Sequence, residues 1–297
     1  MSSTMEYKSN QNLELSLDDN ILDEKEAFYP KIKVIYFSPT GTTKKIIKNV
    51  IKAIESKQVE YVDLTKDNII SKKENIYTSK DDLIILGAPV YGGFLYKEFR
   101  NYLKNIDFNN KAVAIVLLYG NAAIMFAKRE IISIVKKNNG NVVGYGEFVG
   151  EHSFSTKELP VAINRPNAED INMAISFGKA IREELKNNIE KNKSLSLFDR
   201  FIGKVADIKP VHTGRRIFTI PKTDYELCDN CGVCIKKCPK ACIDNHIITD
   251  KKACIVCMAC VKACHKNARI SKAKNPLIKM GLKKINRNKN ESKFVVF

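Results

Sequence analysis

Long hydrophobic runs are missing from this chain of 297 residues. A membrane-spanning helix needs about 20 consecutive apolar residues, and no stretch of the sequence comes near that length. Residues 1–30 also lack a basic region followed by an apolar run, which is the pattern of a secretory signal. We therefore expect no membrane span and a cytoplasmic location.

Acidic residues are in short supply, because 33 Asp and Glu stand against 50 Lys and Arg and leave a net charge of +17. Such an excess can indicate a nucleic-acid-binding protein. The lysines are nevertheless scattered along the chain, and the one dense basic stretch is Lys272–Lys293 near the C-terminus. Scattered charge does not make a basic patch, so we expect no nucleic-acid partner.

Cysteine, in contrast, is abundant. The chain has nine cysteines, and in a reducing compartment they point to metal ligation or thiol chemistry rather than to disulfides. Each cysteine of a second run lies 26 residues after its counterpart in a first run, so the region is an internal duplication. The two runs are Cys228-x2-Cys231-x2-Cys234-x3-Cys238 and Cys254-x2-Cys257-x2-Cys260-x3-Cys264.

The spacing within each run suits an iron–sulfur cluster. Three thiolates at i, i+3 and i+6 can bind three irons of one 4Fe–4S cluster, while the fourth cysteine begins the next helix and faces the other cluster. A zinc ribbon is the alternative, but it pairs two Cys-x2-Cys hooks around one ion. We therefore predict two clusters with crossed ligands. The first would be held by Cys228, Cys231, Cys234 and Cys264, and the second by Cys254, Cys257, Cys260 and Cys238.

The two runs resemble those of the bacterial two-cluster ferredoxins. The resemblance implies a small α+β module of about 50 residues, whose folding depends on its clusters because so short a segment buries little apolar surface. His265 follows Cys264 where that family usually has proline. The ninth cysteine, Cys242, matches Ala268 in the duplication, so we expect a buried small residue there rather than a ligand.

Upstream of the cysteines, short β-rich segments alternate with segments of helical period. This alternation predicts an α/β domain with a five-stranded parallel sheet. The expected strands are 31–37, 58–63, 81–88, 111–119 and 141–149, and the expected helices are 43–54, 94–106, 122–137 and 168–188. Asn167 is placed to cap the last helix.

A phosphate-binding loop is expected directly after the first strand, where Ser38-Pro39-Thr40-Gly41-Thr42-Thr43 opens a helix. Backbone amides at a helix N-terminus bind phosphate, and a glycine allows close approach. No lysine stands in the Walker position, which disfavours a nucleoside triphosphate. A plain hydroxyl-rich turn is the alternative. The pattern resembles the FMN-phosphate loop of flavodoxins, which implies a flavodoxin-like doubly wound sheet.

Two further loops follow the carboxyl ends of later strands, where open α/β sheets bind ligands. Each offers an aromatic ring and glycine, which suits a flat ring, so FMN is the expected cofactor. The candidate cofactor-binding residues are Ser38, Thr40, Gly41, Thr42, Thr43, Pro89, Tyr91, Gly92, Tyr119, Gly120 and Asn121. The chain has no tryptophan, and its third loop lacks the acidic residues common in flavodoxins. A sheet that binds no flavin therefore stays open as an alternative. His152 is expected to make a structural hydrogen bond, and we assign no catalytic residue.

The layout as a whole resembles bacterial proteins in which a flavodoxin-like domain is fused to a two-cluster ferredoxin. The expected segments are an acidic flexible extension (1–30), the flavodoxin-like domain (31–190), a linker (191–222), the ferredoxin module (223–270) and a basic tail (271–297).

The resemblance implies electron transport between the clusters and FMN, and a redox partner protein with an acidic docking surface. Two alternatives stay open. One is a flavin-dependent oxidoreductase with its own small substrate (a quinone, a nitro compound or a nicotinamide). The other is a ferredoxin-type carrier whose sheet binds no flavin. An electron carrier is favoured over a substrate-specific enzyme.

Overall fold

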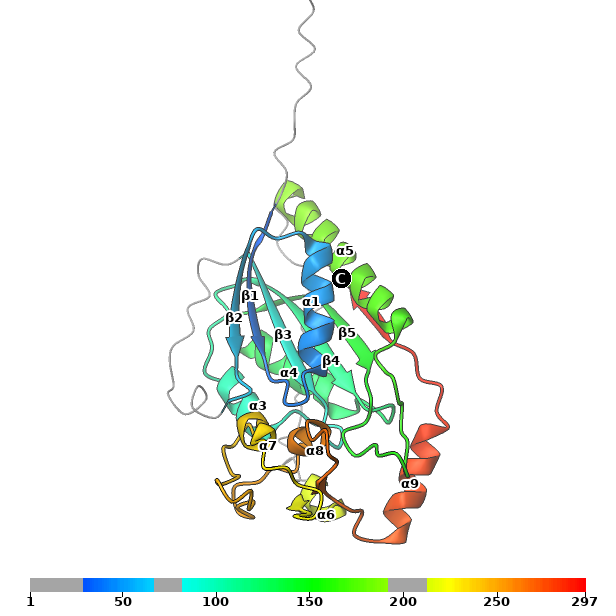
Figure 1. Cartoon of the computed structure of the whole chain (residues 1–297). Coiled ribbons are helices and arrows are strands. Elements are labelled where there is room, and N and C mark those ends of the chain that lie inside the picture. Colours follow the sequence, from blue (N-terminus) through cyan, green and yellow to red (C-terminus); the bar gives the residue numbers. More distant parts are fainter. Residues whose placement is uncertain (1–28, 67–81, 192–212) are drawn as a thin grey trace, which may run out of the picture.

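The computed structural model describes residues 29–66, 82–191 and 213–297. Its main body is a six-stranded sheet in the order β2-β1-β3-β4-β5-β8 (Figure 1). Five strands run parallel: β1 (Lys31–Tyr36), β2 (Gln58–Asp63), β3 (Leu83–Pro89), β4 (Ala112–Tyr119) and β5 (Asn141–Val149). Strand β8 (Lys293–Val296) pairs antiparallel with β5. The order 2-1-3-4-5 of the parallel strands is that of the flavodoxin-like doubly wound fold.

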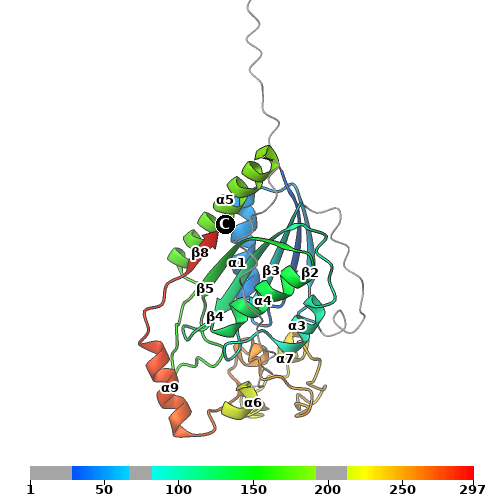
Figure 2. The ribbon, with the colours of Figure 1, turned by 180° about the vertical axis from the view of Figure 1, so that it is seen from behind.

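Helices cover both faces of the sheet, as the opposite views in Figures 1 and 2 show. One face carries α1 (Thr42–Ile54) and α5 (Ala168–Lys191), and the other carries α3 (Lys97–Leu103) and α4 (Phe126–Lys137). Because the central strands are covered on both sides, β3 and β4 are almost wholly apolar. The strands and helices expected upstream of the cysteines are confirmed, with ends that differ by a few residues.

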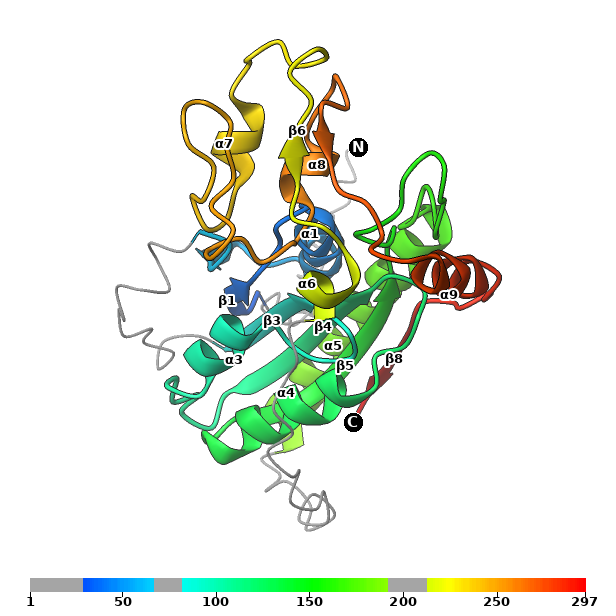
Figure 3. The same ribbon diagram turned by 90° about the horizontal axis from the view of Figure 1, so that it is seen from below.

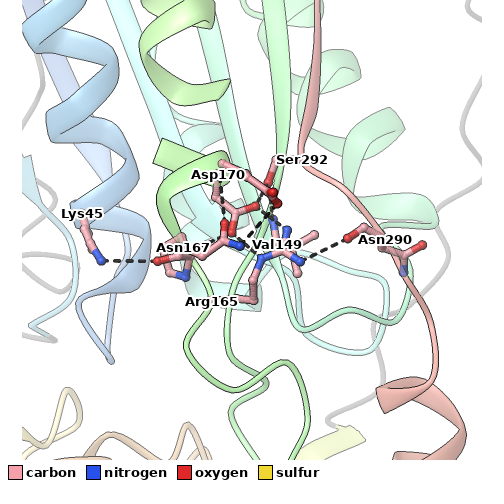
Figure 4. Close-up of polar contacts among 9 residues, drawn as sticks. Lys45, Val149, Arg165, Asn167, Asp170, Asn290 and Ser292 are labelled. Carbon is pink, nitrogen blue, oxygen red and sulfur yellow. Dashed lines mark hydrogen bonds and ion pairs between the residues drawn. The ribbon is translucent and has the colours of Figure 1, made fainter. Parts of the chain in front are cut away.

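The predicted cap of α5 is also confirmed. The amide of Asp170 donates to Oδ1 of Asn167 at 3.1 Å, and the amide of Asn167 donates to Oδ2 of Asp170 at 2.8 Å. This reciprocal pairing fixes the start of the helix. Burial alone would raise the pKa of Asp170, but hydrogen bonds from Arg165 and Ser292 outweigh it and lower the pKa. Figure 4 shows this carboxylate at the centre of a polar network. The amide of Val149 donates to Oγ of Ser292 at 3.0 Å, so the network ties the segment before β8 to the end of β5.

The C-terminal region corrects two predictions. Residues 271–297 are not a tail outside the fold, because they form α9 (Pro276–Asn286) and β8. The sheet consequently has six strands rather than five, and it is not purely parallel. The physical reason lies in β8, where Phe294 and Val296 alternate with outward residues and pack onto the core beneath α5. The surrounding lysines dominate the composition and conceal this short pattern.

A second, smaller unit lies at the carboxyl ends of the parallel strands and contains all nine cysteines (Figure 3). Its elements are α6 (Thr213–Ile217), β6 (Lys222–Thr223), α7 (Val233–Lys237), α8 (Ala259–Lys262) and β7 (Arg269–Ile270). Strands β6 and β7 pair antiparallel. Most of the predicted linker, residues 192–212, lies outside the described residues, and so do residues 1–28 of the predicted extension.

Candidate functional site

A cavity of about 470 Å³ lies between the sheet and the cysteine module, at the carboxyl ends of the parallel strands. This is the edge at which open α/β sheets bind ligands, and small-molecule sites usually enclose about 300–1,000 Å³. Four loops of the sheet form its floor. They contribute, among others, Thr40, Pro89, Tyr91, Gly92, Tyr119, Gly120, His152 and Phe154. The space and its aromatic and glycine lining fit a cofactor of the size and shape of FMN.

Six of the eleven candidate cofactor-binding residues line this cavity. They are Thr40, Pro89, Tyr91, Gly92, Tyr119 and Gly120. The other five do not line it. Ser38, Gly41, Thr42 and Thr43 belong to the same loop as Thr40, and Asn121 stands between the lining residues Gly120 and Ala122 in the sequence. The structure therefore brings the three predicted loops together around one cavity.

The loop after β1 presents free backbone amides at its tip. Gly41 has a φ of 81°, a left-handed conformation that glycine adopts without strain. Its amide donates to the carbonyl of Ser38 at 3.0 Å, and the amide of Lys44 donates to Oγ of Ser38 at 3.1 Å. The amides of Thr42 and Thr43 begin α1 and have no acceptor among the described residues. Free amides at the start of a 13-residue helix suit a phosphate group.

Two tyrosines give the cavity aromatic walls. Tyr91 and Phe94 exchange two backbone hydrogen bonds, which close the tight turn around Gly92. Burial raises the pKa of Tyr91 well above its ordinary value. Burial also raises the pKa of Tyr119. Both side chains therefore stay neutral, as suits contact with a flat ring.

His152 packs against the loop after β4. A Cβ at Gly120 would come within 2.5 Å of the imidazole ring, so the glycine permits this approach. Nδ1 of His152 accepts a hydrogen bond from the amide of Phe154 at 3.1 Å, which confirms the predicted structural hydrogen bond. Burial, aided by the charge of Lys262, lowers the pKa of His152 to about 4. The ring is therefore neutral at pH 7 and carries its proton on Nε2.

Asn121 fastens α9 to the loop after β4. Its side-chain amide donates to the carbonyls of Ile285 at 3.0 Å and Asn288 at 2.9 Å. Its backbone carbonyl accepts from the side chains of Asn288 and Asn290. The amide group is thus engaged with α9, and a direct role in binding a cofactor stays a prediction.

The roof of the cavity is a feature that sequence reasoning missed. Apolar residues of α6, the cysteine module and α9 form it: Gly214, Ile217, Ile255, Val256, Ile278, Gly281, Leu282 and Ile285. A signal for α9 existed, since residues 278, 282 and 285 follow helical spacing. It lay inside the basic stretch, where the lysines dominate. The C-terminal segment therefore completes the cavity instead of trailing from it.

The internal duplication of the cysteine module is visible in its backbone. Left-handed conformations recur 26 residues apart, at 230 and 256, at 232 and 258, and at 241 and 267. Thr223 pairs with Arg269 in the β6–β7 ribbon, and the equivalent residues Thr249 and Ile243 pair in an isolated bridge. In each pair one residue comes from each half. The half that supplies the threonine in one pair supplies the threonine's partner in the other. The two halves are therefore related by a pseudo-twofold axis.

Cys238 lies with the cysteines of the second run rather than with its own. A small void in the module is lined by Cys238, Cys242, Cys254, Cys257 and Cys260. Cys264, in turn, is followed by His265, whose ring lies within 4.8 Å of the thiol of Cys231 in the first run. Cys231 is exposed, and every cysteine that lines the void is buried. Thiolates are the usual ligands of iron–sulfur clusters, so the residues present fit the two crossed four-cysteine sets, here named the first and second sets.

Cys242 adds a fifth sulfur to the second set. Its Sγ lies 3.4 Å from that of Cys238. Hydrogen bonding with Cys242 lowers the pKa of Cys238 and that of Cys254 below the ordinary value of a thiol. Burial raises the pKa of Cys257 above its ordinary value. A lowered pKa favours the thiolate, which is the form that binds metal.

Cys242→Ala is nevertheless expected to leave the iron content and the visible spectrum unchanged. The residue equivalent to Cys242 is Ala268, which is likewise buried, so the fold accommodates alanine at this position. Iron and sulfide per chain, with an absorbance spectrum, measure the effect. Cys257→Ala is the matched control, because it removes a predicted ligand from the same void. Selective loss of one cluster in Cys242→Ala would instead make the ninth cysteine a ligand.

His265 links the two cysteine runs at the exposed end of the first set. Its Nε2 lies 2.9 Å from Oδ2 of Asp229, and Cys231 stands beside both. His265, which directly follows Cys264, therefore connects the two halves of the module.

A family model described as a flavodoxin domain matches residues 33–139, and together with the strand order it establishes a flavodoxin-like α/β domain. Among solved structures, a flavodoxin from the domain Archaea shares 17% identity, with a TM-score of 0.38, over 52% of this chain and 99% of its own. A Fusobacterium nucleatum flavodoxin bound to flavin mononucleotide shares 21% identity, with a TM-score of 0.36, over 54% of this chain and 98% of its own. A flavodiiron protein from Giardia intestinalis shares 16% identity, with a TM-score of 0.40, over 55% of this chain and 38% of its own. No match to a curated protein was found.

None of the described helices combines the length and the apolar character of a membrane-spanning segment.

Proposed function

We propose that this chain is an electron-transfer iron–sulfur flavoprotein. The first and second cysteine sets each hold a 4Fe–4S cluster, and the cavity of about 470 Å³ holds FMN. FMN can exchange one or two electrons, so in combination with the clusters it connects single-electron transfer to two-electron chemistry.

The observation that carries the proposal is the wall shared by the cavity and the second set. Ile255 and Val256 line the cavity, and in the sequence they lie between Cys254 and Cys257. The amide of Val256 donates to Sγ of Cys254 at 3.4 Å. Ile255 and Val256 also line the small void among the cysteines of the second set. Only a thin layer of side chains thus separates the second set from the cavity.

The two cysteine sets differ in burial, which suits them to different roles in electron transfer. The first set includes the exposed Cys231, so it is the natural point of contact for a redox partner protein. The second set is buried, and its void shares Ile255 and Val256 with the cavity wall, so it would pass electrons between the first set and the flavin. The net charge of +17 favours a partner with an acidic docking surface, and no nucleic acid is needed.

Within the cavity, the chain binds and shields the flavin. The free amides of Thr42 and Thr43 receive the phosphate group beyond the cavity wall, in the loop that contributes Thr40 to that wall. Tyr91 and Tyr119 offer aromatic faces to the ring. The apolar roof, with α9 held in place by Asn121, keeps water away from it.

The proposal is tested by purifying the protein without oxygen. About eight irons, about eight sulfides and one FMN per chain are expected. Rapid-mixing reduction with a one-electron donor then compares wild type with Cys257→Ser, which should keep FMN but reduce it more slowly. Zinc without sulfide would exclude the clusters, and iron–sulfide without flavin would leave a ferredoxin-type carrier. Turnover of a quinone, nitro compound or nicotinamide by the isolated protein would make it an enzyme instead.

A further inference from the structure

Arg269 is a buried cation without an acidic partner. The residue is 2% exposed. Its guanidinium donates to Oγ1 of Thr223 at 2.6 Å and of Thr249 at 2.5 Å, and to the carbonyls of Ile247 at 3.0 Å and Pro221 at 3.1 Å. No carboxylate among the described residues pairs with it, and Nε has no acceptor there. A guanidinium carries a full positive charge, and a buried charge is costly unless an opposite charge compensates it.

The four oxygens are arranged in symmetry-related pairs. Thr223 is equivalent to Thr249 in the duplication, and Pro221 is equivalent to Ile247. One terminal nitrogen, Nη1, binds Thr223 and Ile247, and the other, Nη2, binds Thr249 and Pro221. The guanidinium of Arg269 therefore lies across the pseudo-twofold axis of the module, between its two halves.

The residue equivalent to Arg269 is Ile243, which is 4% exposed. The same position in the same local fold is thus filled by an apolar side chain in the other half. The fold of each half does not require an arginine here, so the charge calls for a separate explanation.

Both cysteine sets lie within reach of this charge. Nη2 of Arg269 lies 3.9 Å from Sγ of Cys260, a member of the second set. Cys234, a member of the first set, is the equivalent of Cys260 in the duplication. Because the guanidinium bonds equivalent groups of the two halves, it lies between the two sets.

We propose that Arg269 is a counter-charge shared by the two 4Fe–4S clusters and that it raises both of their reduction potentials. The inference rests on the proposed function. A cluster with its four thiolates carries about −2 when oxidised and about −3 after it has accepted one electron. A nearby cation stabilises the more negative form more strongly, and the weak screening of the interior strengthens the effect. Its place across the axis makes the effect similar for the two clusters, so an electron can pass between them without a large difference in free energy.

Arg269→Gln tests the proposal, because it removes the charge and keeps hydrogen-bond donors. Anaerobic redox titration followed by electron paramagnetic resonance measures both potentials, and iron, sulfide and FMN are assayed on the same samples. Both potentials are expected to fall while cluster content stays at the wild-type level. Arg269→Lys keeps the charge and is expected to return both potentials toward the wild-type values.

Arg215→Gln is the matched control. Nε of Arg215 donates to the carbonyl of Cys254 at 2.7 Å, so this half-buried cation lies beside the second set. Its loss is expected to lower one potential, and by less than the loss of Arg269 does.

Unchanged potentials in a fully loaded Arg269→Gln would overturn the inference, and so would a shift confined to one cluster. If Arg269→Gln does not assemble its clusters, the result for Arg269→Lys decides between the explanations. Normal cluster content in Arg269→Lys supports a role for the charge, and a failure equal to that of Arg269→Gln refutes the inference. Absence of iron and sulfide from the wild type would instead refute the proposed function.

Discussion

Cys238→Ser is expected to destroy the cluster held by Cys254, Cys257 and Cys260 and to spare the cluster of its own run. Cys238 does not begin a helix as predicted, because it follows the end of α7 in an extended conformation. It does line the void formed by the three cysteines of the second run. A serine hydroxyl is a much poorer iron ligand than a thiolate, so the cluster that depends on residue 238 is lost. The iron content should fall from about eight to about four per chain.

The iron content of double variants tests whether the ligands cross. If the ligands cross, Cys228→Ser with Cys238→Ser removes one ligand from each cluster, and almost no iron should remain. Cys257→Ser with Cys238→Ser removes two ligands from the same cluster, and about four irons should remain. Uncrossed ligands would reverse the two results. Cys264→Ser is the control from the other half, and it should spare the cluster of the second run.

The sequence predicts most of the sheet because parallel strands buried on both faces leave a strong signal. Strand β4 reads as an unbroken apolar run, and α1 shows a clear helical period. The C-terminal region gives no such signal. Strand β8 spans only four residues, and α9 is embedded in lysines. Their roles depend on contacts with distant elements, such as the bonds of Asn121 to residues more than 160 positions away, and these contacts do not appear in the local sequence.

Residue type alone does not show which groups also build the loop. The hydroxyl of Ser38 accepts the amide of Lys44 within the loop. Thr43 is 1% exposed, with its side chain near Gly87, so contact of either side chain with a phosphate stays a prediction. Arg269 is a third case, because a single arginine close to a basic stretch gives no hint of burial on a symmetry axis. Only the duplication, once folded, gives it that position.

Gly41→Val is expected to weaken FMN binding by about two to four powers of ten and to leave both clusters intact. Gly41 has a φ of 81°, which a β-branched residue tolerates poorly. The loop must therefore rearrange, and the free amides of Thr42 and Thr43 leave the positions from which they can bind a phosphate. Each such charge-assisted hydrogen bond is worth about 1.5–3 kcal/mol, and two of them account for the expected loss.

Riboflavin, which has no phosphate, provides the control that isolates this contribution. FMN and riboflavin are titrated into flavin-free wild type and variant, and binding is followed by fluorescence quenching. Wild type should bind FMN far more tightly than riboflavin, and in Gly41→Val the two affinities should converge because only the phosphate contacts are lost. An equal loss of affinity for both flavins would mean that the substitution disturbs the ring site near Thr40 instead. A variant that binds FMN as well as wild type would place the phosphate elsewhere. Wild type without saturable binding at micromolar FMN would mean that the sheet serves as a scaffold for the cysteine module.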